Sequence, residues 1–265
     1  MDFQHLEEVM RRLALQAGAK IMEIYESPDF EVKTKSDASP VTEADEAADA
    51  LISAGLRAAF PEVVLITEEQ SDSHALQAST FLIVDPLDGT KEFVQRRGDF
   101  TVNIAYVEEG APLRGIVYAP AKNRLFYTLA DGTSVEELMP FDLETRGEIK
   151  KISVSTPDPE ALVVVASKSH RDAATDAYIA RYKVKDLRSA GSSLKFCLVA
   201  TGEADLYPRL GPTMEWDTAA GDAVLRGAGG AVIRLEGGEN LTYGKFGWKN
   251  PYFLAYSNGI ELIAL

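Results

Sequence analysis

An apolar tetrad followed at once by an acidic turn constrains this chain more than any other segment. Residues 81–84 read Phe-Leu-Ile-Val, and residues 85–90 read Asp-Pro-Leu-Asp-Gly-Thr. A short apolar run bounded by turn residues predicts a buried strand, and the proline and glycine of the second string then interrupt regular structure. The pattern therefore predicts two carboxylates, Asp85 and Asp88, on a tight turn at the end of a buried strand.

The oxygen atoms of this turn suit a divalent cation. The carbonyl of Leu87 lies between the carboxylates of Asp85 and Asp88, and the hydroxyl of Thr90 follows. Carboxylates and carbonyls are the hard oxygen ligands that Mg²⁺ prefers. The alternative interpretation is a polar turn in which Asp88 and Gly89 supply only turn chemistry. The full string after a buried strand favours the metal site.

Length and composition are those of an ordinary globular protein. The 265 residues can form one large domain or two medium ones, with 46% hydrophobic and 26% charged residues. No apolar run approaches the roughly 18 residues that span a bilayer, and the first residues do not resemble a signal peptide. With one cysteine, Cys197, neither a disulfide framework nor a thiolate metal cluster is expected. We therefore expect a cytoplasmic protein, and peripheral association with the inner membrane is not readable from the sequence.

The formal net charge of −14 narrows the choice of partners. It argues against a general nucleic-acid surface and against an anionic-membrane surface. A small anionic substrate is compatible with this charge if bound cations and a few local Lys or Arg residues supply the positive potential. The oligomeric state does not follow from the sequence.

Hydrophobic periodicity predicts an α+β first half. Apolar residues at helical spacing predict helices over residues 2–25 and 47–60. The second helix is preceded by Thr42 and Asp45 in the pattern of a capping box. Residues 30–40 predict a loop or a short hairpin. Strands are expected at 63–66, 81–84, 101–107, 114–119 and 124–130.

The second half alternates between strands and helices. Residues 131–148, which precede it, are polar and poorly periodic and predict a surface excursion. Further strands are expected at 162–166, 183–187, 204–207 and 231–235, and helices at 172–181, 192–201 and 218–228. Strands separated by helices imply parallel pairing covered by helices, and residues 252–256 would add an edge strand. The predicted fold class is a layered α/β arrangement, α+β over 1–150 and α/β over 151–265.

Acidic residues at the ends of other predicted helices and strands are further candidate ligands, in addition to Asp85 and Asp88. Glu68 follows the strand predicted at 63–66, Asp45 opens a helix, and Asp217 precedes the small residues at 219–221. Taken alone, Asp45 fits a capping box, and Asp217 fits an N-cap as well as a ligand. The small residues leave the helix start open to a ligand, and a helix N-terminus favours phosphate.

Two strings identify the family that the chain resembles. The acidic turn at 85–90 and the string Trp-Asp-Thr-Ala-Ala at 216–220 resemble the hallmarks D-P-[LI]-D-G-T and W-D-x-A-[AG]. These are hallmarks of the inositol monophosphatase-like family of metal-dependent, lithium-sensitive phosphatases. Residues 67–69 and 41–45 resemble the acidic segments upstream of them. The resemblance covers most of the chain and implies the family's layered αβαβα sugar-phosphatase fold.

Within that family the likeness is strongest to the 3′(2′),5′-bisphosphate nucleotidases of the CysQ type. The strings that carry it are DPLDGTKEF at 85–93, FTVNI at 100–104, VYAP at 117–120, SKSH at 167–170, GSSLKFC at 191–197 and YPR at 207–209. The weakest match is residues 131–148. The resemblance implies that residues 1–150 form a metal-binding half, and that residues 151–265 complete the active site and bind the nucleotide.

The resemblance implies two or three Mg²⁺ ions. Glu68, Asp85 and the Leu87 carbonyl would hold one ion. Asp85, Asp88 and Asp217 would hold a second, with Asp85 bridging, and a third, weaker ion would lie near Glu68. Paired ions suit an in-line phosphoryl transfer because they stabilise both the attacking and the leaving oxygen.

The catalytic residues implied by the resemblance are Asp45, Thr90 and Glu68. Thr90 paired with Asp45 would orient the attacking water and help to deprotonate it. No covalent enzyme intermediate is implied. Cys197 lies in a predicted apolar helix, where a core thiol is the better interpretation.

A second group of residues would bind the substrate. His170, Ser192, Lys195 and Arg209 would contact the ribose and the phosphate that is not cleaved, with Ser192 and Lys195 on one helical face. The alternatives are a structural or merely exposed His170, a solvated Lys195 and a surface salt bridge at Arg209. The remaining residues expected to border the substrate are Glu68, Leu87, Asp88, Gly89, Thr90 and Asp217. Three charged residues after the turn are expected at the surface: Lys91, Arg96 and Arg97.

These inferences predict a Mg²⁺-dependent phosphatase. It would remove the 3′-phosphate from adenosine 3′,5′-bisphosphate, giving AMP and phosphate, with the related sulfated nucleotide as a second substrate. The alternative enzyme is an inositol monophosphatase or a broad-specificity sugar phosphatase, which the strings SKSH and GSSLKFC count against. An alternative of another class is a metal or phosphate sensor without turnover. A sensor needs no water-activating pair, so Thr90 and Asp45 count against it.

Overall fold

The computed structural model describes residues 1–28, 32–34, 40–169 and 171–264. Its helices are α1 (Phe3–Glu26), α2 (Glu43–Ala59), α3 (Thr90–Val94), α4 (Ala173–Ile179), α5 (Leu194–Ala200) and α6 (Ala219–Gly227), with 3-10 turns η1 (Ser71–Ala75) and η2 (Pro120–Lys122). Each helix predicted from periodicity is present, with ends that differ by a few residues. Within the described ranges, no helix is both long and apolar enough to cross a membrane.

The strands form three sheets within the described residues. A small antiparallel pair, β1 (Val32–Thr34) with β2 (Pro40–Thr42), agrees with the hairpin alternative for residues 30–40. The largest sheet has seven strands: β3 (Val64–Thr67), β4 (Thr80–Asp88), β5 (Thr101–Glu108), β6 (Ala111–Ala119), β7 (Arg124–Thr128), β8 (Ser134–Glu137) and β9 (Ile149–Lys151). The third has five: β10 (Leu162–Ser167), β11 (Val184–Ala190), β12 (Leu206–Arg209), β13 (Ala231–Arg234) and β14 (Phe253–Tyr256).

The seven-stranded sheet begins with one parallel pair and continues antiparallel. β3 and β4 are parallel, and every later neighbour in the order β3-β4-β5-β6-β7-β8-β9 is antiparallel. β4 extends through Asp88, so the expected break after Val84 is wrong. An irregularity between Asp85 and Asp88 absorbs Pro86, which has no N–H to give to the ladder. The acidic turn is therefore a bulge inside a strand.

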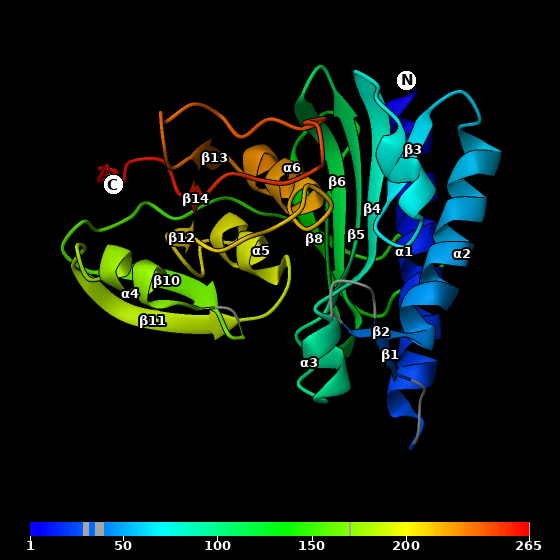
Figure 1. The fold of residues 1–265 in the computed structure, drawn as a ribbon, viewed down its shortest axis with the longest axis horizontal. Helices are drawn as coiled ribbons and strands as arrows, with labels where there is room; N and C mark the ends of the chain where they lie inside the picture. Colours follow the sequence, from blue (N-terminus) through cyan, green and yellow to red (C-terminus); the bar gives the residue numbers. More distant parts are fainter. Residues whose placement is uncertain (29–31, 35–39, 170, 265) are drawn as a thin grey trace.

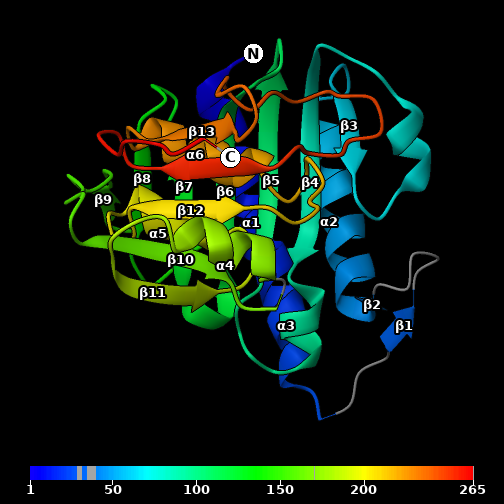
Figure 2. The same cartoon turned by 60° about the vertical axis from the view of Figure 1, so that its left-hand side comes forward.

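The five-stranded sheet is less parallel than its alternating sequence predicts. β10 pairs in parallel with β11 and β12. β14 lies between β12 and β13 and is antiparallel to both, and Figure 2 shows it as the red strand between yellow β12 and orange β13. The expectation of an edge strand at 252–256 is therefore wrong, and β13 occupies the edge instead. The local pattern of a strand does not encode which neighbours it will have.

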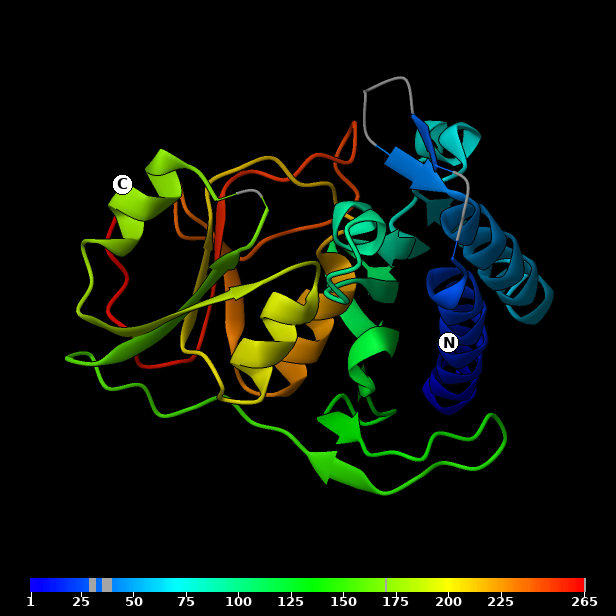
Figure 3. The ribbon, with the colours of Figure 1, turned by 90° about the horizontal axis from the view of Figure 1, so that it is seen from below.

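Packing of these elements produces five layers, seen edge-on in Figures 1 and 3. α1 and α2 cover one face of the seven-stranded sheet. α5 and α6 lie between this sheet and the five-stranded one, and α4 covers the outer face of the latter. The αβαβα layering expected from the resemblance is confirmed.

Apolar side chains fill the spaces between the layers. Leu13 of α1, Ile52 of α2 and Ile104 of β5 share one buried cluster, and Phe196 of α5 and Val224 of α6 belong to a second cluster between the sheets. Each buried side chain of this size contributes roughly 1.5–3 kcal/mol. The seven-stranded sheet is thus packed on both faces.

The segment expected to be a surface excursion, residues 131–148, contains strand β8. Glu137 at its end is 1% exposed and pairs with Arg11 of α1, with 2.6 Å between Oε1 and Nη2. The prediction was wrong for this strand because it is four residues long and ends in two glutamates, which give no hydrophobic periodicity. Its partner Arg11 lies 126 positions earlier, so the buried ion pair leaves no local signal.

Candidate active site

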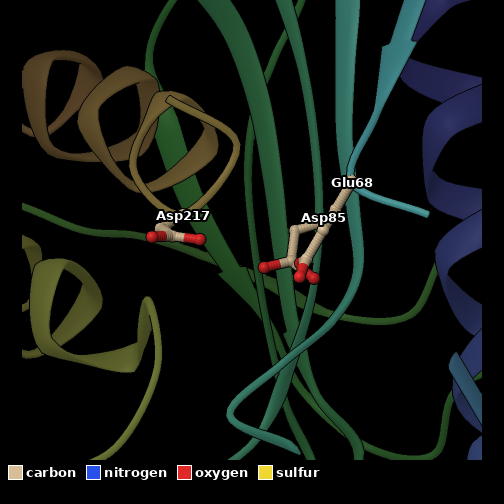
Figure 4. A group of neighbouring side chains, drawn as sticks. All are labelled: Glu68, Asp85 and Asp217. Carbon is tan, nitrogen blue, oxygen red and sulfur yellow. The ribbon is translucent and has the colours of Figure 1, made fainter. Parts of the chain in front are cut away.

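Three carboxylates from distant parts of the chain converge on one point. Oxygen atoms of Glu68, Asp85 and Asp217 all lie within 4.8 Å of one another. Figure 4 shows Glu68, which directly follows β3, beside Asp85 of β4, with Asp217 across from them near the start of α6. The first two belong to the seven-stranded sheet and the third to the second half of the chain, so the cluster exists only in the folded molecule.

The parallel pairing of β3 and β4 brings Glu68 to Asp85. Thr67 is the register partner of Val84, so the residues that follow them, Glu68 and Asp85, lie next to each other. The N–H of Glu68 donates to the carbonyl of Val84 at 3.1 Å, which extends the pairing by one step. The Thr67 hydroxyl, which donates to Asp49 of α2, anchors the same strand end to the helical layer.

Asp217 is not an N-cap. The N-cap of α6 is Thr218, whose side chain makes no capping bond, and the Asp217 carboxylate instead accepts from the N–H of Met214 at 2.7 Å. The small residues after it serve packing. A Cβ on Gly221 would lie 2.6 Å from the Phe196 ring, and Ala219 is fully buried. The interpretation that these small residues open the helix start to a ligand is therefore wrong.

Asp88 joins the cluster from the bulge of β4 and borders the same cavity as the three converging acids. Its carboxylate accepts hydrogen bonds from the N–H of Ser193 at 2.6 Å and from Nδ2 of Asn103 at 3.3 Å. Burial raises the pKa of Asp88 to about 6, while Lys195 acts in the opposite direction. Burial, then repulsion from Asp88 and Glu68, raises the pKa of Asp217 well above its usual value.

This donor set fits a hard divalent cation. Carboxylate oxygens that repel one another in a buried place cost free energy unless a cation compensates them. Glu68, Asp85 and Asp217 supply three such oxygens at ligand spacing, and the Leu87 carbonyl and Asp88 border the same cavity. Oxygen-only ligands favour Mg²⁺, Ca²⁺ or Mn²⁺ over softer metals.

The hydroxyl of Thr90 lies beside this cluster and reaches the carboxylate of Asp45. It donates to Oδ1 at 3.2 Å, and the Leu87 carbonyl is 3.4 Å from the same hydroxyl. Asp45 is 1% exposed and also completes the capping box of α2. Gly89 makes the approach possible. It has φ 95°, and a Cβ there would lie 2.9 Å from the Asp99 carbonyl.

Two buried cationic side chains line the same cavity as the acids. Lys195 is 4% exposed and Arg209 is 8% exposed, so neither the solvated lysine nor the surface salt bridge describes them. The Lys195 Nζ donates to the carbonyl of Ser192 at 2.5 Å and lies 5.3 Å from the centre of the Tyr207 ring. Burial lowers the pKa of Lys195 to about 8, although Asp88 opposes the shift. The cavity therefore offers fixed positive charge for a second anion.

The other residues that were given a predicted place near the substrate differ in where they lie. Ser192 borders the cavity but precedes helix α5 and has φ 50°, so it does not share a helical face with Lys195 as expected. His170 lies outside the described residues. Lys91 is exposed, as expected, and lies at the margin of the cavity.

Four residues in or next to the cavity had no role assigned to them from the sequence. The cavity measures about 330 Å³, and its walls include the aromatic rings of Phe196 and Tyr207. Ser193 and Asn103 lie behind it and bond to Asp88. All four stand in strings that carried the family resemblance, and that was the only signal available for them. Cys197 is fully buried in α5, and burial raises the pKa of its thiol, as a core position requires.

Comparisons with known proteins show which family the chain is similar to. The model of the inositol monophosphatase family matches residues 2–259. The 3′(2′),5′-bisphosphate nucleotidase CysQ of Escherichia coli K12 is 44% identical over 229 residues, which cover 85% of this chain and 89% of that protein. The corresponding protein of Buchnera aphidicola is 41% identical over 88% of this chain and 85% of its own.

The fold agrees with a solved relative as well. The crystal structure of CysQ from Bacteroides thetaiotaomicron superimposes with a TM-score of 0.83 at 37% identity, covering 96% of this chain and 98% of the other. A family match over nearly the whole chain, relatives above 40% identity and a shared fold all lead to one assignment. The chain belongs to the inositol monophosphatase family.

Proposed function

We propose that this protein is a Mg²⁺-dependent 3′(2′),5′-bisphosphate nucleotidase. It would hydrolyse the 3′-phosphate of adenosine 3′,5′-bisphosphate to give AMP and inorganic phosphate, and would act in the same way on the related 5′-phosphosulfate. The observation that carries the proposal is the convergence of Glu68, Asp85 and Asp217 in a cavity that also contains buried Lys195 and Arg209. The names of the relatives support the choice of substrate.

The acidic cluster would hold two Mg²⁺ ions, with a third, weaker ion near Glu68. Glu68, Asp85 and the Leu87 carbonyl would hold the first, and Asp85, Asp88 and Asp217 the second. Bound ions would neutralise the phosphate oxygens and lower the pKa of an attacking water. A phosphate monoester needs this help because its dianion repels hydroxide and its unaided hydrolysis is very slow.

Thr90 and Asp45 would form the water-activating pair. The Thr90 hydroxyl already donates to Asp45, so its lone pairs are directed to accept a hydrogen bond from water. As the water oxygen bonds to phosphorus and the bond from phosphorus to the 3′-oxygen breaks, the water's proton would pass through Thr90 to Asp45. The 3′-oxygen would take a proton from solvent water and leave as the ribose hydroxyl, and Asp45 would return its proton to the solvent.

Lys195, Arg209 and Ser192 would bind the ribose and the phosphate that is not cleaved. Charge-assisted bonds from buried cations to a phosphate are about twice as strong as neutral ones. Lys195 and Arg209 are buried in the cavity wall, which suits an anion that is itself removed from water. His170 is proposed for the same group on the resemblance alone.

The alternative is an inositol monophosphatase or a broad-specificity sugar phosphatase. Both would use the same acids and the same water-activating pair. They would not need two buried cations in the cavity wall, because their substrates carry no second phosphate on a ribose. The enzyme would act in the cytoplasm, with residues 1–150 as the metal-binding half and 151–265 as the half that completes the site and binds the nucleotide.

A substrate panel tests the proposal. Phosphate release is measured with adenosine 3′,5′-bisphosphate, inositol 1-phosphate and fructose 1,6-bisphosphate, with Mg²⁺ and after chelation. The proposal expects kcat/KM for the adenosine bisphosphate to exceed the other two by at least about tenfold, which is about 1.4 kcal/mol of discrimination. Comparable values for inositol 1-phosphate would favour the alternative.

A further inference from the structure

Two strings from different halves of the chain meet behind the acidic cluster. Asn103 belongs to FTVNI on β5, and Ser193 belongs to GSSLKFC just before α5. Nδ2 of Asn103 donates to Oγ of Ser193 at 3.0 Å, and each residue is 1% exposed. Neither side chain borders the cavity, and the proposed mechanism assigns no step to either one.

Ser193 bonds to both halves of the acidic cluster. Its N–H donates to Oδ2 of Asp88 at 2.6 Å, and its hydroxyl donates to the backbone carbonyl of Asp217 at 2.6 Å. Asp88 stands on the seven-stranded sheet, and Asp217 precedes α6 in the second half of the chain. One serine therefore ties together two acids that repel each other.

Asn103 fixes the direction of this hydrogen-bond chain. Its amide nitrogen donates both to Asp88 and to the Ser193 oxygen, which leaves the Ser193 proton for the Asp217 carbonyl. Among the described residues, Oδ1 of Asn103 has no hydrogen-bond partner. The side chain thus serves as a donor, and a carboxylate in its place could not serve in that way.

The loop that carries Ser193 packs closely against the first half of the chain. A Cβ on Gly191 would lie 2.5 Å from the Asp99 carbonyl, so only glycine permits this approach. Ser192 has φ 50°, a left-handed conformation that costs a non-glycine residue free energy. The contact between the two halves is therefore close at the point where Ser193 meets Asp88.

We propose that Asn103 and Ser193 are positioning residues that hold Asp88 and Asp217 at the separation a divalent cation requires. The inference rests on the proposed metal site and adds to it the pair that sets its geometry across the two halves. Replacing a residue that hydrogen-bonds to a metal ligand, without itself touching the metal, typically lowers metal affinity or activity by about 10–100-fold. The two side chains need not touch the substrate to have this effect.

The test compares Ser193→Ala and Asn103→Asp with the unmodified protein. Ser193→Ala keeps the N–H to Asp88 and removes the hydroxyl link to Asp217. Asn103→Asp keeps the shape but replaces the donor with an acceptor and draws the Ser193 proton away. We expect the Mg²⁺ concentration for half-maximal activity to rise about tenfold or more in both variants, while KM for the nucleotide at saturating Mg²⁺ changes little.

A second measurement does not depend on turnover. Mg²⁺ that binds only the folded protein raises its Tm, and we expect both variants to require about tenfold more Mg²⁺ for the same rise. Ser257→Ala is the matched control, because Ser257 is fully buried, bonds to Ser155 and lies away from the cavity. It should lower Tm equally with and without Mg²⁺.

The outcomes separate the two claims. If the unmodified protein shows no rise in Tm with Mg²⁺, the proposed metal site fails, and this inference fails with it. If the unmodified protein responds and both variants respond at the same Mg²⁺ concentration, only the positioning role is overturned. A shift in the Mg²⁺ response of both variants, absent in Ser257→Ala, supports it.

Discussion

The hydroxyl of Thr90 donates a 3.2 Å hydrogen bond to Oδ1 of Asp45, a residue 45 positions earlier in the chain. The other oxygen of that carboxylate, Oδ2, accepts from the N–H and the hydroxyl of Thr42 at 2.7 and 2.6 Å. The helix cap and the contact with Thr90 therefore use different oxygens. A single aspartate therefore completes the capping box of α2 and reaches the candidate active site.

Removing this hydroxyl should slow the chemical step. Thr90→Val keeps the shape of the side chain but cannot relay a proton, so we expect kcat to fall by about 10²–10⁴-fold, the usual contribution of a positioned acid–base group. Thr90→Ser keeps the hydroxyl and is the matched control. Steady-state kinetics at saturating Mg²⁺ would measure both. A Thr90→Val enzyme as active as Thr90→Ser would exclude the proposed relay.

Replacing Lys195 should weaken binding of the second phosphate. Lys195→Met preserves length and removes the charge, and we expect KM for adenosine 3′,5′-bisphosphate to rise about 10–100-fold, as loss of a charge-assisted bond of roughly 1.5–3 kcal/mol implies. KM for a substrate with one phosphate should change much less. Lys185→Met, on exposed strand β11, is the control. Equal effects on both substrates would argue against a role for Lys195 in specificity.

Stability without metal should depend on pH through Asp88. Burial raises the pKa of Asp88 in the folded protein to about 6, above its usual 3.8. The folded state therefore binds a proton that the unfolded state releases, so the metal-free protein should become more stable as pH falls from 7.5 to 5.5. Asp217, whose pKa is also raised, acts in the same direction. Lys195, with a pKa of about 8, stays mostly protonated across this window.

Thermal unfolding in EDTA at several pH values measures this effect. We expect Tm to rise between pH 7.5 and 5.5, and the rise to shrink in Asp88→Asn, which cannot ionise. Saturating Mg²⁺ should remove the trend, because a bound cation keeps the carboxylates ionised. A metal-free Tm that falls over this range, equally in the unmodified protein and in Asp88→Asn, would contradict the assignment.

The buried pair between α1 and β8 should matter to stability. Arg11 and Glu137 are joined by two hydrogen bonds of 2.7 and 2.6 Å, and their side chains are 5% and 0% exposed. Glu137→Gln leaves the arginine charge buried without its partner and should cost about 3–5 kcal/mol of unfolding free energy. Asp186→Asn, in the exposed pair with Arg188, should cost about 1 kcal/mol or less.

Denaturant unfolding compares the two variants directly. Equal losses for Glu137→Gln and Asp186→Asn would show that the buried pair is not specially stabilising. The double change of Arg11 and Glu137 to methionine should recover much of the lost stability, since replacing a whole buried pair with apolar groups costs far less than breaking it.

The acidic cluster was predictable because each of its residues has a strong local signal in the sequence. Glu68, Asp85 and Asp88 come at the ends of apolar strands, and parallel pairing of β3 with β4 delivers two of them to one edge. Asp217 lies in a hallmark string. The layered fold followed from the alternation of strands and helices and from the family resemblance.

The features that sequence reasoning missed depend on long-range contacts. The place of β14 within its sheet, the burial of Lys195 and the hydroxyl chain through Ser193 are set by partners far away in the chain. The small residues at the start of α6 were expected to leave room for a ligand, although the Phe196 ring of α5 packs against Gly221 there. A local pattern reports which face of an element is apolar, and it does not report what will cover that face.

The most direct test of the central claim is the rate of phosphate release from adenosine 3′,5′-bisphosphate as a function of Mg²⁺, measured for the unmodified protein and for Asp88→Asn. We predict turnover that disappears with chelation, returns with Mg²⁺, and falls by about 10²-fold or more in the variant although its fold persists by circular dichroism. Release that continues in EDTA, or an Asp88→Asn enzyme with near-normal turnover, would contradict the account.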